Sequence, residues 1–225
     1  MLDFLREFLL SGEVAAMPTE TVYGLAANAL NPEACQRVFD IKNRPSIDPL
    51  ICHVPRFSGI ETYCDTNSIA EILGDAFWPG PLTIVLKKKP IIPDIVTAGL
   101  NSVAVRCPSH PDFKRLIDDY PFPIAAPSAN PFSYISPTRA DHVNANLGEK
   151  IEYILDGGPC SLGVESTIID ARDPGRPKVL RYGALPLEDI ENALGCRIDT
   201  PAPTSKSVQI APGSLPKHYL SLIHI

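Results

Sequence analysis

Short apolar runs alternate with segments of helical periodicity along most of this chain, and this alternation constrains the fold more than any other feature. Four early runs have the length of buried strands, at residues 14–17, 50–54, 82–86 and 103–106. Apolar side chains recur at helical spacing at residues 32–41 and 68–77. Strands that alternate with helices predict an α/β architecture.

The alternation continues to residue 194. Further helices are predicted over 112–120, 138–147 and 187–194, the last ended by Gly195. Further strands are predicted over 124–126, 153–155, 167–170 and 179–181. The chain starts with an amphipathic helix that Gly12 ends and whose apolar side chains include Leu2, Leu5 and Leu9.

Two helices have recognisable start signals. Asn31-Pro32-Glu33 places a cap, a first-turn proline and an acid in the order typical of a helix N-terminus. Ser68-x-x-Glu71 predicts a capping box, in which the serine would be the N-cap.

Composition limits the classes of protein to consider. The 225 residues, 44% of them hydrophobic, can form one large domain, which we place at residues 1–198. The net charge of −6 disfavours a protein that mainly coats nucleic acid. No apolar run approaches the roughly 20 residues of a membrane span, so we expect no membrane association. Six scattered cysteines without metal-binding spacing predict free thiols in a reducing, cytoplasmic setting and no metal site in the protein.

Residues 199–225 differ from the rest of the chain. The stretch "DTPAPTSKSVQIAPGSLPKHYL" is rich in Pro and Ser and follows neither periodicity. We expect a linker or an extended flap here.

The common nucleotide-binding motifs do not occur. Gly158 and Gly163 have the glycine spacing of a P-loop, but Val164-Glu165 stands where Lys-Ser/Thr is required. The chain also lacks Gly-x-Gly-x-x-Gly, His-Glu-x-x-His and Gly-x-Ser-x-Gly. These absences disfavour the usual dinucleotide-binding and hydrolase classes.

Polar loops follow several of the predicted strands. "PTETVYGL" holds three hydroxyl groups and a carboxylate, and "APSANPFSYISPT" and "GVESTIID" are similarly polar. Lys42 and Arg44 leave the end of a predicted helix, and Arg181 ends a strand. Each has an ordinary structural explanation, such as turn chemistry or a favourable helix dipole. Together they favour one shared pocket, because sites in α/β sheets lie at strand ends.

These residues resemble the YrdC-like L-threonylcarbamoyladenylate synthases. "PTETVYGL" is similar to the family's opening signature, and Lys42-x-Arg44 with Ser128-x-Asn130 is similar to its Lys-x-Arg and Ser-x-Asn pair. The remaining similar segments follow in the family's order: "RPSIDPLICHV", "FWPGPLTIVL", "VAVRCP", "ISPT", "GVEST" and "LRYGAL". The resemblance implies a single catalytic domain with a twisted, mixed sheet, flanking helices and a central substrate cavity.

The resemblance also implies a reaction: L-threonine, bicarbonate or CO2, and ATP give threonylcarbamoyl-AMP and pyrophosphate, with Mg2+ on the ATP phosphates. Partner transferase proteins would then pass the threonylcarbamoyl group to tRNA. Lys42 and Arg44 would be the catalytic cations. The residues implied to bind ATP are Lys42, Arg44, Asp48, Ser128, Asn130, Ser136, Arg181 and His218. Those implied to surround threonine are Thr21, Tyr23, His53, Arg106 and Thr167.

The chain departs from the family's pattern at a few places. Asp48 stands where asparagine is common, and Ser133 where glycine is frequent. "APGSLPKHYL" is similar to the linker of longer members, which continue into a second domain, whereas this sequence ends in "SLIHI". We therefore expect the second domain to be absent. A separate hypothesis is that the tail folds over ATP as a lid with His218 or Tyr219 against the nucleotide, and the alternative is an untethered linker.

Two other functions fit parts of the sequence. One is a noncatalytic RNA-binding module that uses the face around Lys42 and Arg44. The other is an enzyme that adenylates carbamoyl phosphate, as similar domains inside larger maturation proteins do; those proteins carry further domains and zinc motifs, which this chain lacks.

Overall fold

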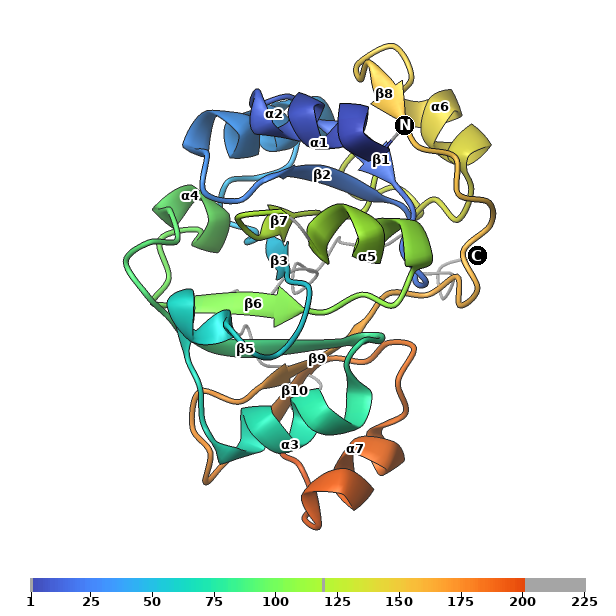
Figure 1. The fold of residues 1–225 in the computed structure, drawn as a ribbon. Coiled ribbons are helices and arrows are strands. Elements are labelled where there is room, and N and C mark those ends of the chain that lie inside the picture. Colours follow the sequence, from blue (N-terminus) through green and yellow to red (C-terminus); the bar gives the residue numbers. More distant parts are fainter. Residues whose placement is uncertain (1, 119, 201–225) are drawn as a thin grey trace.

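Alternating side chains on the central strands give the sheet two apolar faces. Ile84, Val105 and Ile169 belong to the larger core, while Val85 and Ile168 belong to a smaller cluster on the other face. We analysed a computed structural model, which describes residues 2–118 and 120–200. It confirms the predicted α/β fold, a mixed sheet flanked by helices (Figure 1).

Within the described residues, ten strands form one sheet with the order β10-β9-β5-β6-β3-β7-β2-β1-β8, and β4 pairs with β5 beside this path. The strands are β1 Ala15–Met17, β2 Gly24–Asn28, β3 Ile51–His53, β4 Cys64–Asp65, β5 Leu82–Lys88, β6 Ser102–Arg106, β7 Ile124–Ala125, β8 Tyr153–Ile154, β9 Thr167–Asp170 and β10 Lys178–Arg181. β3 runs parallel to β6, and β5 runs parallel to β9 but antiparallel to β6. The sheet is therefore mixed, as the resemblance implied.

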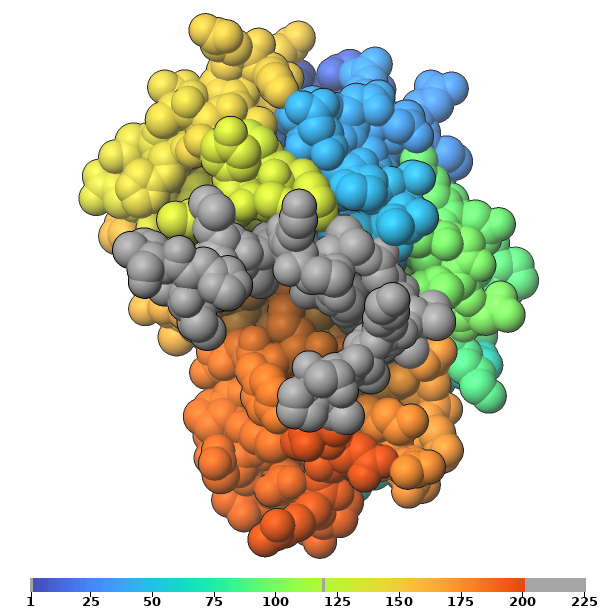
Figure 2. All heavy atoms as spheres, turned by 180° about the vertical axis from the view of Figure 1, so that it is seen from behind, coloured from blue at the N-terminus to red at the C-terminus, as the bar shows by residue number. Residues whose placement is uncertain are grey.

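Helices cover both faces of the sheet. They are α1 Leu2–Leu10, α2 Pro32–Lys42, α3 Ser68–Phe77, α4 Asp94–Thr97, α5 Pro111–Asp118, α6 Ala140–Leu147 and α7 Leu187–Leu194, with one 3-10 turn at Ile60–Thr62. Leu5 and Leu9 of α1 pack with Phe113 and Leu116 of α5 on β1 and β2. Seen from behind, the segment with α6 lies above the segment with β10 and α7 (Figure 2).

Helix ends show which local signals were informative. Asn31 caps α2, its side chain accepting hydrogen bonds from the backbone N–H groups of Glu33 and Ala34, as predicted. The capping box at Ser68 was wrong, because Asn67 is the N-cap of α3 and its side chain accepts from Ala70 N–H. Asparagine is at least as good a cap as serine, so the helix starts one residue earlier than the box requires.

The structure contains elements that the sequence patterns did not indicate. β2 follows "PTETVY" directly. Its residues are Gly-Leu-Ala-Ala-Asn, which are mostly small, and none of them is β-branched. α4 and β4 are only four and two residues long, too short for a visible period. β2 matters for function because it pairs with both β1 and β7 and so holds two polar loops together.

Other expectations concern the chain as a whole. All six cysteines are free thiols, as predicted. In the described part of the chain, no helix has the length and apolar character needed to cross a bilayer. The predicted flap and its residues His218 and Tyr219 lie outside the described residues.

Candidate active site

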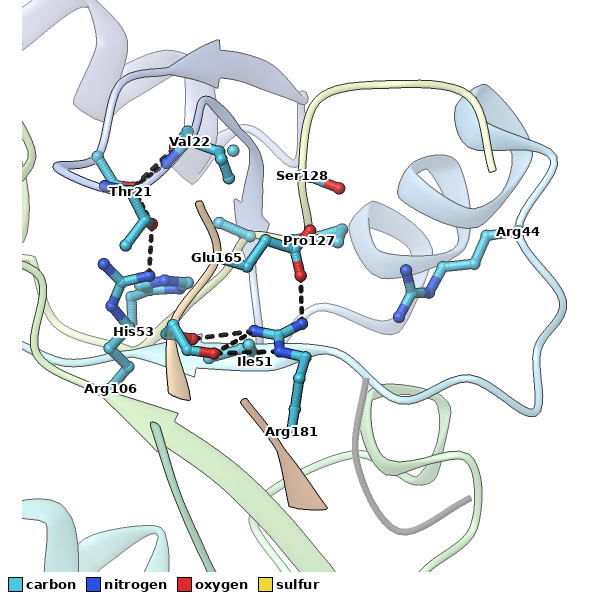
Figure 3. A pocket seen from close by; sticks show the side chains of 14 residues that line it. Thr21, Val22, Arg44, Ile51, His53, Arg106, Pro127, Ser128, Glu165 and Arg181 are labelled. Atoms are coloured by element: carbon cyan, nitrogen blue, oxygen red, sulfur yellow. Dashed lines mark hydrogen bonds and ion pairs between the residues drawn. The ribbon is translucent and has the colours of Figure 1, made fainter. Parts of the chain in front are cut away.

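Polar loops from distant parts of the chain meet at one cavity beside β2, β3 and β6 (Figure 3). Its volume is about 40 Å³, room for only a few water molecules. Six of the residues singled out from the sequence line it: Thr21, Arg44, His53, Arg106, Ser128 and Arg181. The predicted convergence of Arg44 and Ser128 on one cavity is confirmed.

A wider groove adjoins the cavity. Its volume is about 460 Å³, and Ser136, Val164 and Tyr182 are among the residues that line it. Val22, Glu165 and Arg181 line both spaces, so the Glu165 and Arg181 side chains lie at their junction. Of these two spaces, the cavity has the scale of a small polar molecule and the groove is the one large enough for a nucleotide.

The "PTETVYGL" segment uses its hydroxyl groups in two different ways. Thr19 Oγ1 accepts hydrogen bonds from the backbone N–H groups of Thr21 and Val22, at 3.1 and 3.2 Å, which is turn chemistry. Both threonines are buried and line the cavity, and Thr21 Oγ1 accepts from Arg106 at 2.9 Å. The turn and the pocket explanations therefore both fit Thr19, and the pocket explanation fits Thr21.

Arg106 is held by three protein groups. Its Nη2 forms an ion pair with Glu20 Oε1 at 2.6 Å, and its Nε donates to Gly80 O at 3.2 Å. Glu20 also accepts a hydrogen bond from the Ser109 backbone N–H at 3.1 Å. Arg106 and Glu20 are both buried, so the guanidinium is fixed before any ligand binds. The sequence placed the Glu20 carboxylate in the polar "PTETVYGL" segment but did not predict its pairing with Arg106, which lies 86 residues away.

His53 is a neutral imidazole at the cavity wall. It is buried, lines the cavity and packs against Phe113 with the two rings tilted and their centroids 5.1 Å apart. Burial, together with the positive charge of Arg106, lowers the pKa of His53 from 6.5 to about 3. A neutral imidazole has one donor and one acceptor nitrogen, so it suits a substrate hydroxyl.

This pKa predicts a specific pH dependence of stability. Between about pH 6 and pH 4 the unfolded chain protonates His53 and the folded chain does not, so lowering the pH destabilises the fold. His53→Gln removes the imidazole that takes up this proton in the unfolded chain. The free energy of unfolding of the native chain should fall relative to the variant by about 1.4 kcal/mol per pH unit. Urea unfolding of both proteins across this range measures it, and a pH-independent difference would show that His53 is not neutral through burial.

Lys42 supports the Ser128–Asn130 loop. Its buried ammonium donates to the backbone carbonyls of Ser128 and Asn130, both at 2.5 Å. Burial, and secondly the charge of Arg44, lower its pKa well below the usual value. Lys42 is not among the described residues that line the cavity, so its direct contact with ATP stays a prediction. Its observed contacts give it a positioning role.

Arg44 is paired with the unusual residue of the motif, Asp48. Arg44 Nη2 lies 3.0 Å from Asp48 Oδ2, and Arg44 also donates to the backbone carbonyls of Asp48 and Pro49. The two side chains are 2% and 0% exposed, so the pair is fully buried. Asp48 therefore forms an ion pair with Arg44 in this structure, and a direct contact of Asp48 with ATP stays a prediction.

Three further predicted residues are occupied within the protein and do not line the cavity. Tyr23 donates from its hydroxyl to Gly158 O at 2.7 Å, and Thr167 Oγ1 donates to Leu185 O at 2.7 Å. Asn130 Nδ2 donates to the carbonyls of Pro131 and Tyr134 at 2.9 and 2.8 Å. These contacts fix the loops around the cavity, and ligand contacts by these residues stay predictions.

Glu165 and Ser166 line the cavity, although the sequence analysis predicted a ligand contact for neither of them. Glu165 Oε1 accepts from Ser136 Oγ at 2.8 Å, and its Oε2 pairs with Arg181. Ser166 accepts from Arg181 through its backbone oxygen and its hydroxyl. The backbone of Gly183 passes close to that of Glu165, and only glycine fits there because a Cβ would lie 2.3 Å from Glu165 O. Both residues belong to the polar segment "GVEST", which leads into β9.

Ser133 explains the second departure from the family's pattern. Its φ is +69°, in the left-handed region where glycine is favoured. The preference for glycine at this loop position is therefore a backbone requirement, and the serine accepts a conformational cost of roughly 1–2 kcal/mol.

The geometry defines an α/β protein with a small polar cavity beside a wider groove that Arg181 and Glu165 line. The Sua5/YciO/YrdC family model, described as "Telomere recombination", matches residues 7–183. The chain belongs to this family. A threonylcarbamoyl-AMP synthase of Pyrococcus abyssi is 47% identical over 215 residues, covering 94% of this chain and 63% of that protein. One of Bacillus subtilis is 43% identical over 214 residues, covering 94% and 62%.

Solved structures agree with this assignment. The P. abyssi Sua5 structure complexed with L-threonine has a TM-score of 0.92 and 44% identity, covering 97% of this chain and 65% of that chain. Escherichia coli YciO has a TM-score of 0.76 at 22% identity, covering 84% and 92%, and shows the fold alone. The chain thus spans about 63% of the length of the first curated relatives it matches.

Proposed function

We propose that the protein is an L-threonylcarbamoyladenylate synthase, a nucleotidyltransferase that makes threonylcarbamoyl-AMP and pyrophosphate from L-threonine, bicarbonate or CO2, and ATP. One observation carries the proposal: Arg44, Arg106 and Arg181 surround a single cavity that also presents the Thr21 and Ser128 side chains. The names of the P. abyssi and B. subtilis relatives support the same activity.

The chemistry requires little from the protein except position, charge and dryness. The threonine amine adds CO2 to form a carbamate, whose oxygen attacks the α-phosphorus of ATP as pyrophosphate leaves. Two anions must therefore meet, and cations are needed to offset their repulsion. Water would destroy the carbamate and the mixed anhydride, and the burial of Arg44 and Arg106 fits a site that excludes it.

The two spaces divide the substrates between them. We place threonine in the cavity against Thr21, His53 and Arg106. The solved P. abyssi structure complexed with L-threonine supports threonine as a ligand. We place ATP in the groove, with its phosphates toward Arg181, Ser136 and the side of the cavity formed by Arg44 and Ser128. In this arrangement the reacting atoms meet at the junction of the two spaces.

Mg2+ fits as a component of the substrate. Among the described residues no group of three His, Cys, Asp or Glu side chains is arranged to hold a metal ion. Mg2+ commonly binds to substrate phosphates with few protein ligands. We therefore propose that Mg2+ arrives on ATP. Glu165 is the one carboxylate among the described residues that line the cavity or the groove.

The product defines what must follow. An acyl-adenylate is a reactive carrier, so a transferase must accept the threonylcarbamoyl group, and we propose that group's destination is tRNA. The free thiols fit work in the reducing cytoplasm.

The test is release of pyrophosphate with ATP, L-threonine and bicarbonate omitted in turn. We expect release only when all three are present, because the carbamate is the nucleophile. Release without threonine but with carbamoyl phosphate would favour the carbamoyl-phosphate enzyme. Tight, salt-dependent tRNA binding without any turnover would favour the RNA-binding module.

A further inference from the structure

The Glu165 carboxylate lies where the proposed function places the phosphates of ATP, which are also anions. It is the one acidic group among the described residues lining the cavity and the groove, and it lies at their junction. Its side chain is 14% exposed, and that of Arg181 is 11% exposed. A carboxylate in a site for ATP phosphates repels them. Its presence at this position therefore calls for an explanation.

The contacts of Glu165 are those of a bound oxyanion. One carboxylate oxygen accepts the Ser136 hydroxyl at 2.8 Å, and the other pairs with Arg181 Nη1. An arginine and a hydroxyl are also the usual donors to a phosphate oxygen. Both donors were independently implied to bind ATP. A phosphate and the Glu165 carboxylate would therefore compete for the same two side chains.

Arg181 does not need Glu165 to stay in place. Its Nε and Nη2 both donate to Ser166 O, at 3.1 and 3.0 Å, and Nη2 also donates to Ser166 Oγ at 3.0 Å. Ser166 is in turn fixed by its hydroxyl contact with Thr83 Oγ1 at 2.8 Å. Removing the carboxylate charge would thus remove the ion pair at Nη1, while Ser166 still anchors the guanidinium.

We propose that Glu165 is an internal competitor for the ATP phosphates, which determines the affinity of the site for nucleotide. In the absence of ATP it neutralises Arg181 and occupies Ser136, closing the junction between the cavity and the groove. ATP displaces it, and Arg181 Nη1 passes from the carboxylate to a phosphate oxygen. The junction opens only when the nucleotide is present, so the threonine carbamate meets ATP with water excluded. This inference rests on the proposed function.

The competition has a measurable size. If Arg181 is released from Glu165 in about a tenth of the molecules, the apparent affinity for ATP is lowered about tenfold. Glu165→Gln keeps the shape and removes the charge, so it should tighten the Kd for ATP about tenfold. We expect the same direction with inorganic pyrophosphate as the probe. Titration calorimetry without threonine or bicarbonate measures both.

Two further variants make the test specific. Glu13→Gln removes the same charge from an exposed pair with Arg37, and should leave the Kd unchanged. In an Arg181→Gln background the Glu165→Gln change should no longer tighten ATP binding by tenfold, because the contested donor is gone. If Glu165→Gln does not fold, Glu165→Asp withdraws the carboxylate from Arg181 and should give a smaller tightening.

The possible outcomes are distinct. Unchanged or weaker ATP binding by Glu165→Gln, or equal tightening with and without Arg181, would overturn the inference alone. Weakening seen only in the presence of Mg2+ would instead make Glu165 a ligand of the metal on ATP. Failure of the unaltered chain to bind ATP at all would contradict the proposed function and this inference with it.

Discussion

L-2-Aminobutyrate, which lacks only the hydroxyl of threonine, should support pyrophosphate release with a kcat/KM roughly 10⁴-fold lower than that of threonine. The reason is the polarity of the buried cavity wall. Thr21 and His53 are buried there, and a ligand without a hydroxyl would leave polar groups unpaired. Steady-state kinetics with both amino acids at saturating ATP and bicarbonate give the ratio.

Serine provides the matched comparison. It keeps the hydroxyl and lacks one methyl group, which is worth only about 1–3 kcal/mol, so serine should be a poor but measurable substrate. Similar kcat/KM values for threonine and L-2-aminobutyrate would contradict the assignment of the cavity to threonine. A greater loss for serine than for L-2-aminobutyrate would contradict it as well.

Asp48→Ala should destabilise the protein by about 3–5 kcal/mol, the largest effect on stability that we expect from one side chain. The change leaves the guanidinium of Arg44 buried without the carboxylate that lies 3.0 Å from it. Equilibrium unfolding in urea measures the loss. Glu13→Ala is the control, because it breaks an exposed pair with Arg37 and should change the free energy of unfolding little.

A double variant separates the pair from the space it fills. Arg44→Met with Asp48→Leu replaces both charges with apolar groups and should cost less than Asp48→Ala alone. The double variant should also lose activity, because Arg44 lines the cavity. A loss of stability for Asp48→Ala no greater than that for Glu13→Ala would show that the buried pair contributes nothing.

Sequence patterns predicted the framework well where the period was long enough to read. The bounds of α3, β9 and α7 are the predicted ones, and α2 has the predicted Asn31 cap. β2 was missed because its small side chains carry no strand signal. The capping box at Ser68 failed for a different reason, because the adjacent Asn67 takes the N-cap position.

The site was predictable as a set of loops but not as a set of contacts. Polar motifs named Arg44, Ser128 and Arg106, which the fold brings to one cavity. The partners that fix them are distant in sequence: Glu20 lies 86 residues from Arg106, and Lys42 supports a loop 86 to 88 residues away. Glu165 escaped notice because a carboxylate is unexpected where anions bind. Such pairings follow from the strand order, which local patterns do not specify.

The central claim is that threonine and ATP react within one enclosed site, and a crystal structure with both ligands tests it most directly. The crystals would contain L-threonine, bicarbonate and an ATP analogue that cannot release pyrophosphate. We predict that the carboxylated amine places an oxygen about 3–3.5 Å from the α-phosphorus, with Arg44 and Ser128 on the same side. A nucleotide bound outside the groove, with its α-phosphorus out of reach of the amino acid, would contradict the account.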